Sequence, residues 1–152
     1  MSEKKVGRGY LSSALGCRCP RCREGKLFQH RTTINFKKNM LMHKVCPVCN
    51  QPTEIEVGFY YGTSYVSYVL TVALSIASLI AWWVIIGLST NDNRFFYWLG
   101  FNAALLLVLQ PWLMRLSRSL WISWFVKYDP DWKYHQPIDV SERMNPDQAN
   151  NW

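Results

Sequence analysis

The sequence predicts a small β zinc ribbon, followed by an α-helical transmembrane hairpin and an interfacial amphipathic helix. Two short cysteine pairs near the start predict the ribbon. Two long uncharged stretches predict the hairpin, because about 20 apolar residues in a helix cross a bilayer core. The expected segments are a basic start (1–16), the ribbon (17–62), the hairpin (63–114), the amphipathic helix or helix extension (115–128) and a polar tail (129–152).

The cysteine pairs predict a metal site. Cys19 and Cys22 stand in CPRC, and Cys46 and Cys49 stand in CPVC. Two Cys-x-x-Cys clips at this separation are typical of zinc held by four thiolates. About forty residues cannot bury enough apolar surface to fold alone, so we expect the metal to supply the missing stability. Strand-like residues between and after the clips predict a three-stranded ribbon.

Other uses of these thiols stay open to different degrees. Iron is the alternative metal, since it also accepts four sulfurs, and it would make a rubredoxin-like electron carrier. Disulfides are disfavoured because the expected topology places the thiols in a reducing compartment. Asn50 and Gly25 are the residues expected to turn the chain after each clip. The role of the fifth cysteine, Cys17, is undecided.

Catalysis is not expected from these residues. Four protein ligands leave no open position on a zinc ion for water, which excludes zinc-dependent hydrolysis at that site. The serines of the first apolar stretch lack a neighbouring base, and no pair of carboxylates is placed for acid–base chemistry. We therefore expect a protein that is not an enzyme.

The two spans are expected at about 63–89 and 95–114, with a turn at 90–94. The only charged residues between 63 and 114 are Asp92 and Arg94, and both lie in the turn. Tyrosines and tryptophans gather at the ends of both stretches, as they do at the two interfaces of a membrane. This pattern predicts two crossings of a bilayer.

Small and hydroxyl residues predict how the two helices pack. Gly100 and Ala104 form a small-x-x-x-small pair, which allows close approach of helices in lipid. Hydroxyl residues recur at helical spacing on the first span. The residues expected in this contact are Ser67, Thr71, Ser75, Ser78, Gly100, Asn102, Ala104 and Gln110.

Two polar side chains lie inside the second span. An antiparallel hairpin would place Asn102 near Ser78. It would place Gln110 near Thr71 or Ser75. Hydrogen bonds between the helices are the expected role, and a part in transport or proton movement is the alternative. The absence of an ionisable side chain from both spans counts against a pump or carrier.

Charge predicts the orientation. Arg94 is the only Lys or Arg in the turn, whereas the two flanking segments hold the other sixteen. The positive-inside rule then places both termini in the cytoplasm. The expected location is a bacterial inner membrane, crossed twice.

Basic and aromatic residues near the metal site and after the second span predict a lipid or partner surface. Each basic residue near an acidic bilayer surface contributes about 1 kcal/mol of attraction. Lipid docking is therefore favoured, followed by a protein partner, with nucleic acid last. The candidate residues are Arg18, Arg21, Arg23, Lys26, Lys44, Arg115, Arg118, Trp121 and Trp124.

The chain resembles a bacterial family known as domain of unknown function 983. The resemblance lies in the CPRC clip followed by G-x-LF, the CPVC clip, the two spans and the stretch QPWLMRLSRSLWISWFVKYDP at 110–130. It covers about residues 16–131 and places the four clip cysteines on the family's paired cysteines. The chain departs from the family at EIEVGFYYGTSY, where many relatives are acidic and glycine-rich.

The resemblance implies an accessory role in the assembly of respiratory complexes, because some relatives are encoded near respiratory oxidase genes. The residues themselves predict an accessory or assembly subunit that docks onto a larger membrane complex. The alternatives are an iron electron carrier at the membrane and a membrane-tethered ribbon that binds nucleic acid.

Overall fold

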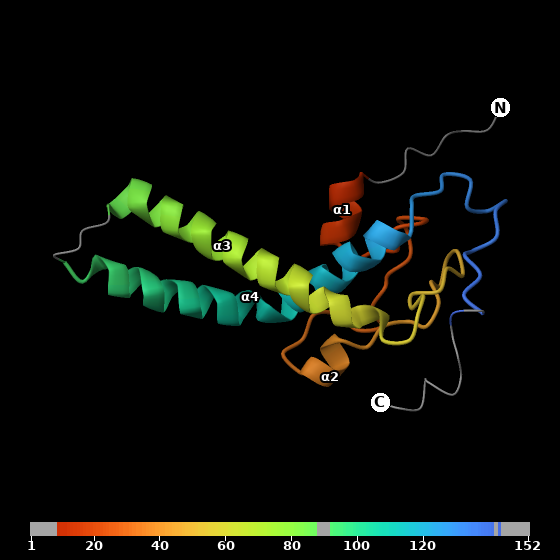
Figure 1. The fold of residues 1–152 in the computed structure, drawn as a ribbon, viewed down its shortest axis with the longest axis horizontal. Helices are drawn as coiled ribbons and strands as arrows, with labels where there is room; N and C mark the ends of the chain where they lie inside the picture. The colour runs from red at the N-terminus through yellow and green to blue at the C-terminus, as the bar shows by residue number, and fades with distance from the viewer. Residues whose placement is uncertain (1–8, 88–91, 142, 144–152) are drawn as a thin grey trace.

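The computed structural model describes residues 9–87, 92–141 and 143 of the chain. Two long helices, α3 (Thr63–Ile86) and α4 (Arg94–Phe125), lie side by side, and the rest of the described chain gathers around one end of this pair (Figure 1). The shorter elements are α1 (Tyr10–Leu15), α2 (Phe36–Asn39) and a 3₁₀ helix, η1 (Phe59–Gly62). Residues 9–62, which contain all five cysteines, are called the cysteine lobe below.

The cysteine lobe contains no β-strand among its described residues. It has three isolated antiparallel bridges, so the three-stranded ribbon expected from the sequence is not seen. Left-handed residues at 17, 23 and 50 turn the chain beside two of these bridges, and the proline in one bridge has no N–H to donate. The bridges join Arg18 to Lys26, Phe28 to Met42, and Val45 to Pro52.

Helices α3 and α4 are long and apolar enough to cross a membrane. Their 24 and 32 residues correspond to about 36 and 48 Å, against about 30 Å for a bilayer core. None of the most apolar window of α3 is buried inside the protein. A core helix of a soluble protein would be largely buried. Residues 88–89 of the expected first span and 90–91 of the expected turn lie outside the described residues.

Helix α4 continues without interruption through Pro111 to Phe125. Of the two alternatives expected for 115–128, a separate interfacial helix and an extension of the second span, the structure has the extension, and it ends at Phe125. Both apolar residues, such as Leu116 and Ile122, and polar residues, such as Arg115 and Ser119, are buried along this extension. The cysteine lobe surrounds the extension, so its polar face is covered by protein.

The core of the molecule forms where the cysteine lobe meets the end of α4. Its largest apolar members come from both parts of the chain, which makes the lobe and the helix extension one packed unit. The buried cluster contains Leu27, Phe28, Ile55, Phe59, Ile122 and Val126 together with the four clip cysteines.

A polar cluster joins the two long helices. The Ser78 hydroxyl donates to Asn102 Oδ1 at 3.0 Å, and Asn102 Nδ2 donates to the Ser75 hydroxyl at 3.2 Å. Trp98 Nε1 donates to the Ser78 hydroxyl at 3.2 Å. Asn102 therefore lies beside Ser78, where the hairpin register places it.

The other expected packing residues lie differently. Gly100 and Ala104 are exposed, and a Cβ added at Gly100 would meet nothing within 4 Å. Both stand two positions from the buried Asn102, and residues two apart do not share a helix face. Gln110 makes no hydrogen bond to Thr71 or Ser75 in the described structure, and the Thr71 hydroxyl donates to the carbonyl of Tyr68 in its own helix.

Candidate metal centre

Four buried cysteine sulfurs lie close together inside the cysteine lobe. The Sγ atoms of Cys19, Cys22, Cys46 and Cys49 all lie within 4.8 Å of one another. The Cys19–Cys49 distance is 3.7 Å and the Cys22–Cys46 distance is 3.8 Å. A regular tetrahedron with metal–sulfur bonds of about 2.3 Å has edges of about 3.8 Å. The four thiols therefore fit one tetrahedral metal ion.

The same turn is used twice to bring these sulfurs together. The N–H of Arg23 donates to the Cys19 carbonyl at 2.8 Å, and the N–H of Asn50 donates to the Cys46 carbonyl at 3.0 Å. Both donors are left-handed, with φ of 58° and 54°. Asn50 was expected in this role. In the first clip, however, the left-handed residue is Arg23 and not Gly25.

Gly25 is required for a different reason, which is space. A Cβ at this position would lie 2.4 Å from the Cys46 sulfur, a distance that real contacts do not reach. The Gly25 N–H donates to the Cys22 sulfur at 3.5 Å. Gly25 therefore lets the backbone of the first clip pass directly beside a sulfur of the second.

We expect Gly25→Ala to lower metal affinity by about tenfold or more, as other changes in the groups around metal ligands do. Competition with a chromophoric chelator on the full chain measures this affinity. Gly9→Ala is the matched control, because a Cβ at Gly9 meets nothing within 4 Å. Equal affinities of the two variants would contradict the proposed contact.

Hydrogen bonds among the four sulfurs separate their pKa values. The pKa of the Cys22 thiol is lowered, first by its hydrogen bond with Cys19, and the pKa of Cys19 is raised by the same bond. The pKa of Cys46 is lowered to about 6, again mainly by the bond with Cys19. The cluster thus already favours the thiolate form at some of its sulfurs, the form that binds metal.

Cys17 does not belong to this cluster. Burial raises the pKa of its thiol to about 11, although the charge of Arg115 opposes the rise. Its carbonyl accepts the N–H of Leu27 at 3.1 Å, and its own φ is 50°. Cys17 therefore contributes a backbone turn and a neutral, half-buried thiol.

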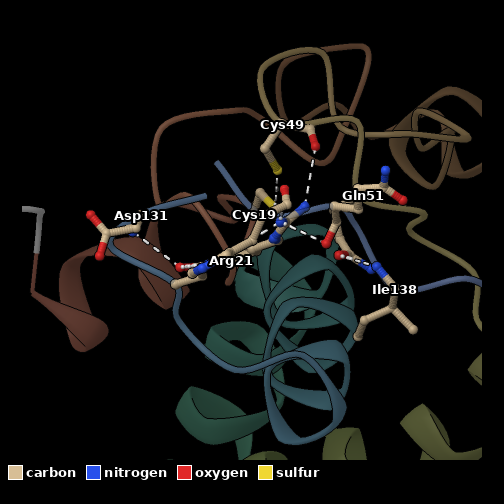
Figure 2. Close-up of polar contacts among 9 residues, drawn as sticks. Cys19, Arg21, Cys49, Gln51, Asp131 and Ile138 are labelled. Atoms are coloured by element: carbon tan, nitrogen blue, oxygen red, sulfur yellow. Dashed lines mark hydrogen bonds and ion pairs between the residues drawn. The ribbon is translucent and has the colours of Figure 1, made fainter. Parts of the chain in front are cut away.

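Arg21 lies inside the protein and not on a lipid-facing surface. Its side chain is 4% exposed. It donates to the Cys49 carbonyl at 3.4 Å and to the carbonyls of His135 and Gln136 at 2.7 and 2.9 Å. It also pairs with the Asp129 carboxylate at 3.5 Å. Figure 2 shows Arg21 between the second clip and the segment after α4.

The segment after α4 is thus part of the metal centre's surroundings. Residues 129–141, called the C-terminal strap, lie against the clips, although the sequence predicted a polar tail there. The N–H of Ile138 donates to Gln51 Oε1 at 3.3 Å (Figure 2), and Gln51 is 1% exposed. Residues 144–152 of the expected tail lie outside the described residues.

Arg115 is also buried, and it joins α4 to the cysteine lobe. Its Nε donates to the Asn39 carbonyl at 2.9 Å and a terminal nitrogen donates to the Arg31 carbonyl at 3.0 Å. Its guanidinium lies 4.7 Å from the centroid of the Phe28 ring. Asn39 Nδ2 donates to the Pro111 carbonyl at 2.8 Å, a contact that sequence reasoning missed.

The remaining members of the expected surface divide by exposure. Trp121 packs against the cysteine lobe. Its Nε1 donates to the Phe59 carbonyl at 2.8 Å, and its ring occupies the space that a Cβ at Gly62 would need. The guanidinium of Arg23 stacks on Tyr128 at 3.8 Å. Lys26, Lys44 and Trp124 are exposed, whereas Arg18, Arg23, Arg118 and Trp121 are half-buried.

Comparison of the chain with protein-family models, with curated proteins and with solved structures gave no match. The family resemblance described above therefore remains an expectation from its motifs.

Proposed function

We propose that this chain is a non-enzymatic protein of the bacterial inner membrane. In this proposal α3 and α4 cross the bilayer, both termini lie in the cytoplasm, and the cysteine lobe holds a structural zinc ion. The observation that carries the proposal is the buried sulfur tetrahedron packed directly against the extension of a helix long enough to span a membrane.

The coordination supports a structural and not a catalytic metal. The four cysteines are each at most 6% exposed, and together they supply all the ligands that tetrahedral zinc takes. A substrate or water would have to displace a sulfur to reach the ion. The metal's role is then to hold the lobe in one shape at the end of the hairpin.

The outer surface of the hairpin supports docking onto another membrane protein. Large apolar side chains stand out from both helices, including Trp83 at 61% exposure and Leu107 at 77%. In a bilayer such residues contact either lipid or another helix. We propose that the chain acts as an accessory or assembly subunit of a larger membrane complex. A respiratory complex is the first candidate because of the family resemblance.

Mild solubilisation of native membranes tests the docking. We expect the tagged full chain to co-purify with a complex much larger than its own 17.8 kDa. Migration of the chain alone under every mild condition would contradict the proposal.

The identity of the metal separates this function from electron transfer, because iron also suits four sulfurs. We expect the purified full chain to be colourless, with one zinc per chain by elemental analysis. Stoichiometric iron with a visible absorption spectrum would instead support the electron-carrier alternative.

A further inference from the structure

A pocket of about 450 Å³ opens between the cysteine lobe and the extension of α4. Its walls come from residues 40–44, from 53–54, from 58 and 60–61, and from Arg118 on α4. Leu41, Met40 and Met42 make part of the wall apolar. None of the four clip cysteines lines the pocket. The structural metal function proposed above does not use it.

Arg118 gives this pocket its chemistry. Its Nε is buried and has no hydrogen-bond partner in the described part of the chain. Its Nη1 makes only a 3.3 Å contact with the Met40 carbonyl and a 3.8 Å contact with the Met42 sulfur. The guanidinium lies 4.9 Å from the Tyr60 ring centroid. Arg118 as a whole is half-buried, but a buried donor nitrogen is unfavourable unless another group accepts from it.

The charges around the pocket favour an anion. Two cations, Lys44 and Arg118, line it, and Glu54 is the one carboxylate among the lining residues. Glu54 forms no ion pair with Arg118 within 4.0 Å among the described residues, although its charge acts on the guanidinium. A phosphate fits the planar donor fork of an arginine, with a lysine to add charge.

The position of the pocket along the hairpin suggests where the phosphate comes from. Tyr61, in its wall, stands two residues before α3 begins at Thr63. Arg118 stands seven residues after Pro111, which is about 10 Å along α4. If the two helices cross a bilayer, the pocket lies at the level of the lipid headgroups. Tyrosine rings are enriched at that level.

We propose that this pocket binds the phosphate of an anionic phospholipid, with Arg118 and Lys44 as the contacting cations. The apolar wall at Met40–Met42 then lies against the lipid's glycerol and first methylenes. This inference rests on the proposed membrane location. It names one specific lipid site, in contrast to a general attraction between a basic lobe and an acidic bilayer.

Native mass spectrometry tests the site. The full chain is released from discs that contain equal amounts of phosphatidylglycerol and phosphatidylcholine, and the retained lipids are counted. We expect the natural chain to retain phosphatidylglycerol and Arg118→Gln to retain about tenfold less, because a charge-assisted fork is lost. Lys127→Gln is the matched control, since Lys127 is exposed and outside the pocket. It should stay within about twofold, as expected for a weakly interacting surface charge.

Each contrary result overturns a stated part of the proposal. Equal losses in Arg118→Gln and Lys127→Gln would show general charge attraction and no site. A lipid source would be excluded if inorganic phosphate bound to the chain while Arg118→Gln retained as much phosphatidylglycerol as the natural chain.

Folding and membrane insertion are checked separately. Lys44→Gln, which is exposed and so less disruptive, should weaken retention in the same direction as Arg118→Gln. Metal content reports whether each variant is folded, and if Arg118→Gln loses metal, unchanged retention in Lys44→Gln overturns the site. If the chain fails to insert even into phosphatidylcholine discs, the proposed membrane function fails and the pocket proposal fails with it. Insertion without selective retention removes only the pocket proposal.

Discussion

Cys46→Ser is expected to release the metal and to unfold the cysteine lobe while the long helices stay helical. Cys46 is fully buried and belongs to the same packed cluster as Leu27 and Phe28, so the metal site and the apolar core of the lobe are one structure. Structural zinc contributes on the order of 10 kcal/mol to the folding of small domains. We expect metal affinity to fall by about a hundredfold or more, beyond the loss seen for changes outside the ligands.

Cys17→Ser is the matched control for this experiment. Its thiol lies outside the sulfur cluster, so the variant should keep one metal per chain and should resist proteolysis as the natural chain does. The two measurements are elemental analysis and limited proteolysis of residues 17–62. Treatment of the natural chain with a strong chelator should reproduce the Cys46→Ser digestion pattern. Full metal content in Cys46→Ser would refute the four-sulfur site.

The cysteine site could be predicted because its information is local. Each Cys-x-x-Cys clip closes through a hydrogen bond between residues four apart, as from Asn50 to Cys46. The proline and asparagine in the second clip already indicate a tight turn. The two long helices could be predicted for a similar reason. Uncharged length is a property of each stretch alone, and it does not depend on what the stretch packs against.

The roles of the buried arginines could not be predicted, because they depend on contacts between distant residues. Arg21 and Asp129 are 108 positions apart, and Arg115 bonds to the Asn39 carbonyl across 76 positions. In sequence, both arginines look like exposed basic residues near a membrane. Nothing local distinguishes an arginine that donates to backbone carbonyls from one that faces water.

The β ribbon expected from the sequence is not seen for the opposite reason: strand propensity is local, but the pairing of strands is not. Residues such as Phe28 and Val45 favour strands, and each does take part in a bridge. Each pairing nevertheless ends after one residue pair, and the turns that assemble the four sulfurs lie beside two of the three bridges. Strand propensity depends strongly on context, and at Val45 that context includes the tight turn of the second cysteine clip.

Arg115→Met is expected to loosen the attachment of the cysteine lobe to α4 without removing the metal. Methionine replaces the guanidinium with an apolar group on a side chain of similar length. The carbonyls of Asn39 and Arg31 then lose their donor. Each hydrogen bond to a charged group contributes about 1.5–3 kcal/mol, so we expect a loss of about 3 kcal/mol in the stability of this contact. Hydrogen exchange of the backbone at 31–42 measures it, and metal content should stay at one per chain.

Arg31→Met provides the matched control, since the Arg31 side chain is exposed and only its carbonyl contacts Arg115. It removes the same charge from the same contact region, and exchange at 31–42 should be unchanged. Arg115→Lys should give an intermediate result, because lysine keeps the charge but lacks the planar fork that reaches two carbonyls at once. If Arg115→Met and Arg31→Met exchange at the same rate, the lobe must be held by its other contacts with α4, such as the Asn39–Pro111 hydrogen bond and the apolar packing. In that case the buried arginine would contribute little to its attachment.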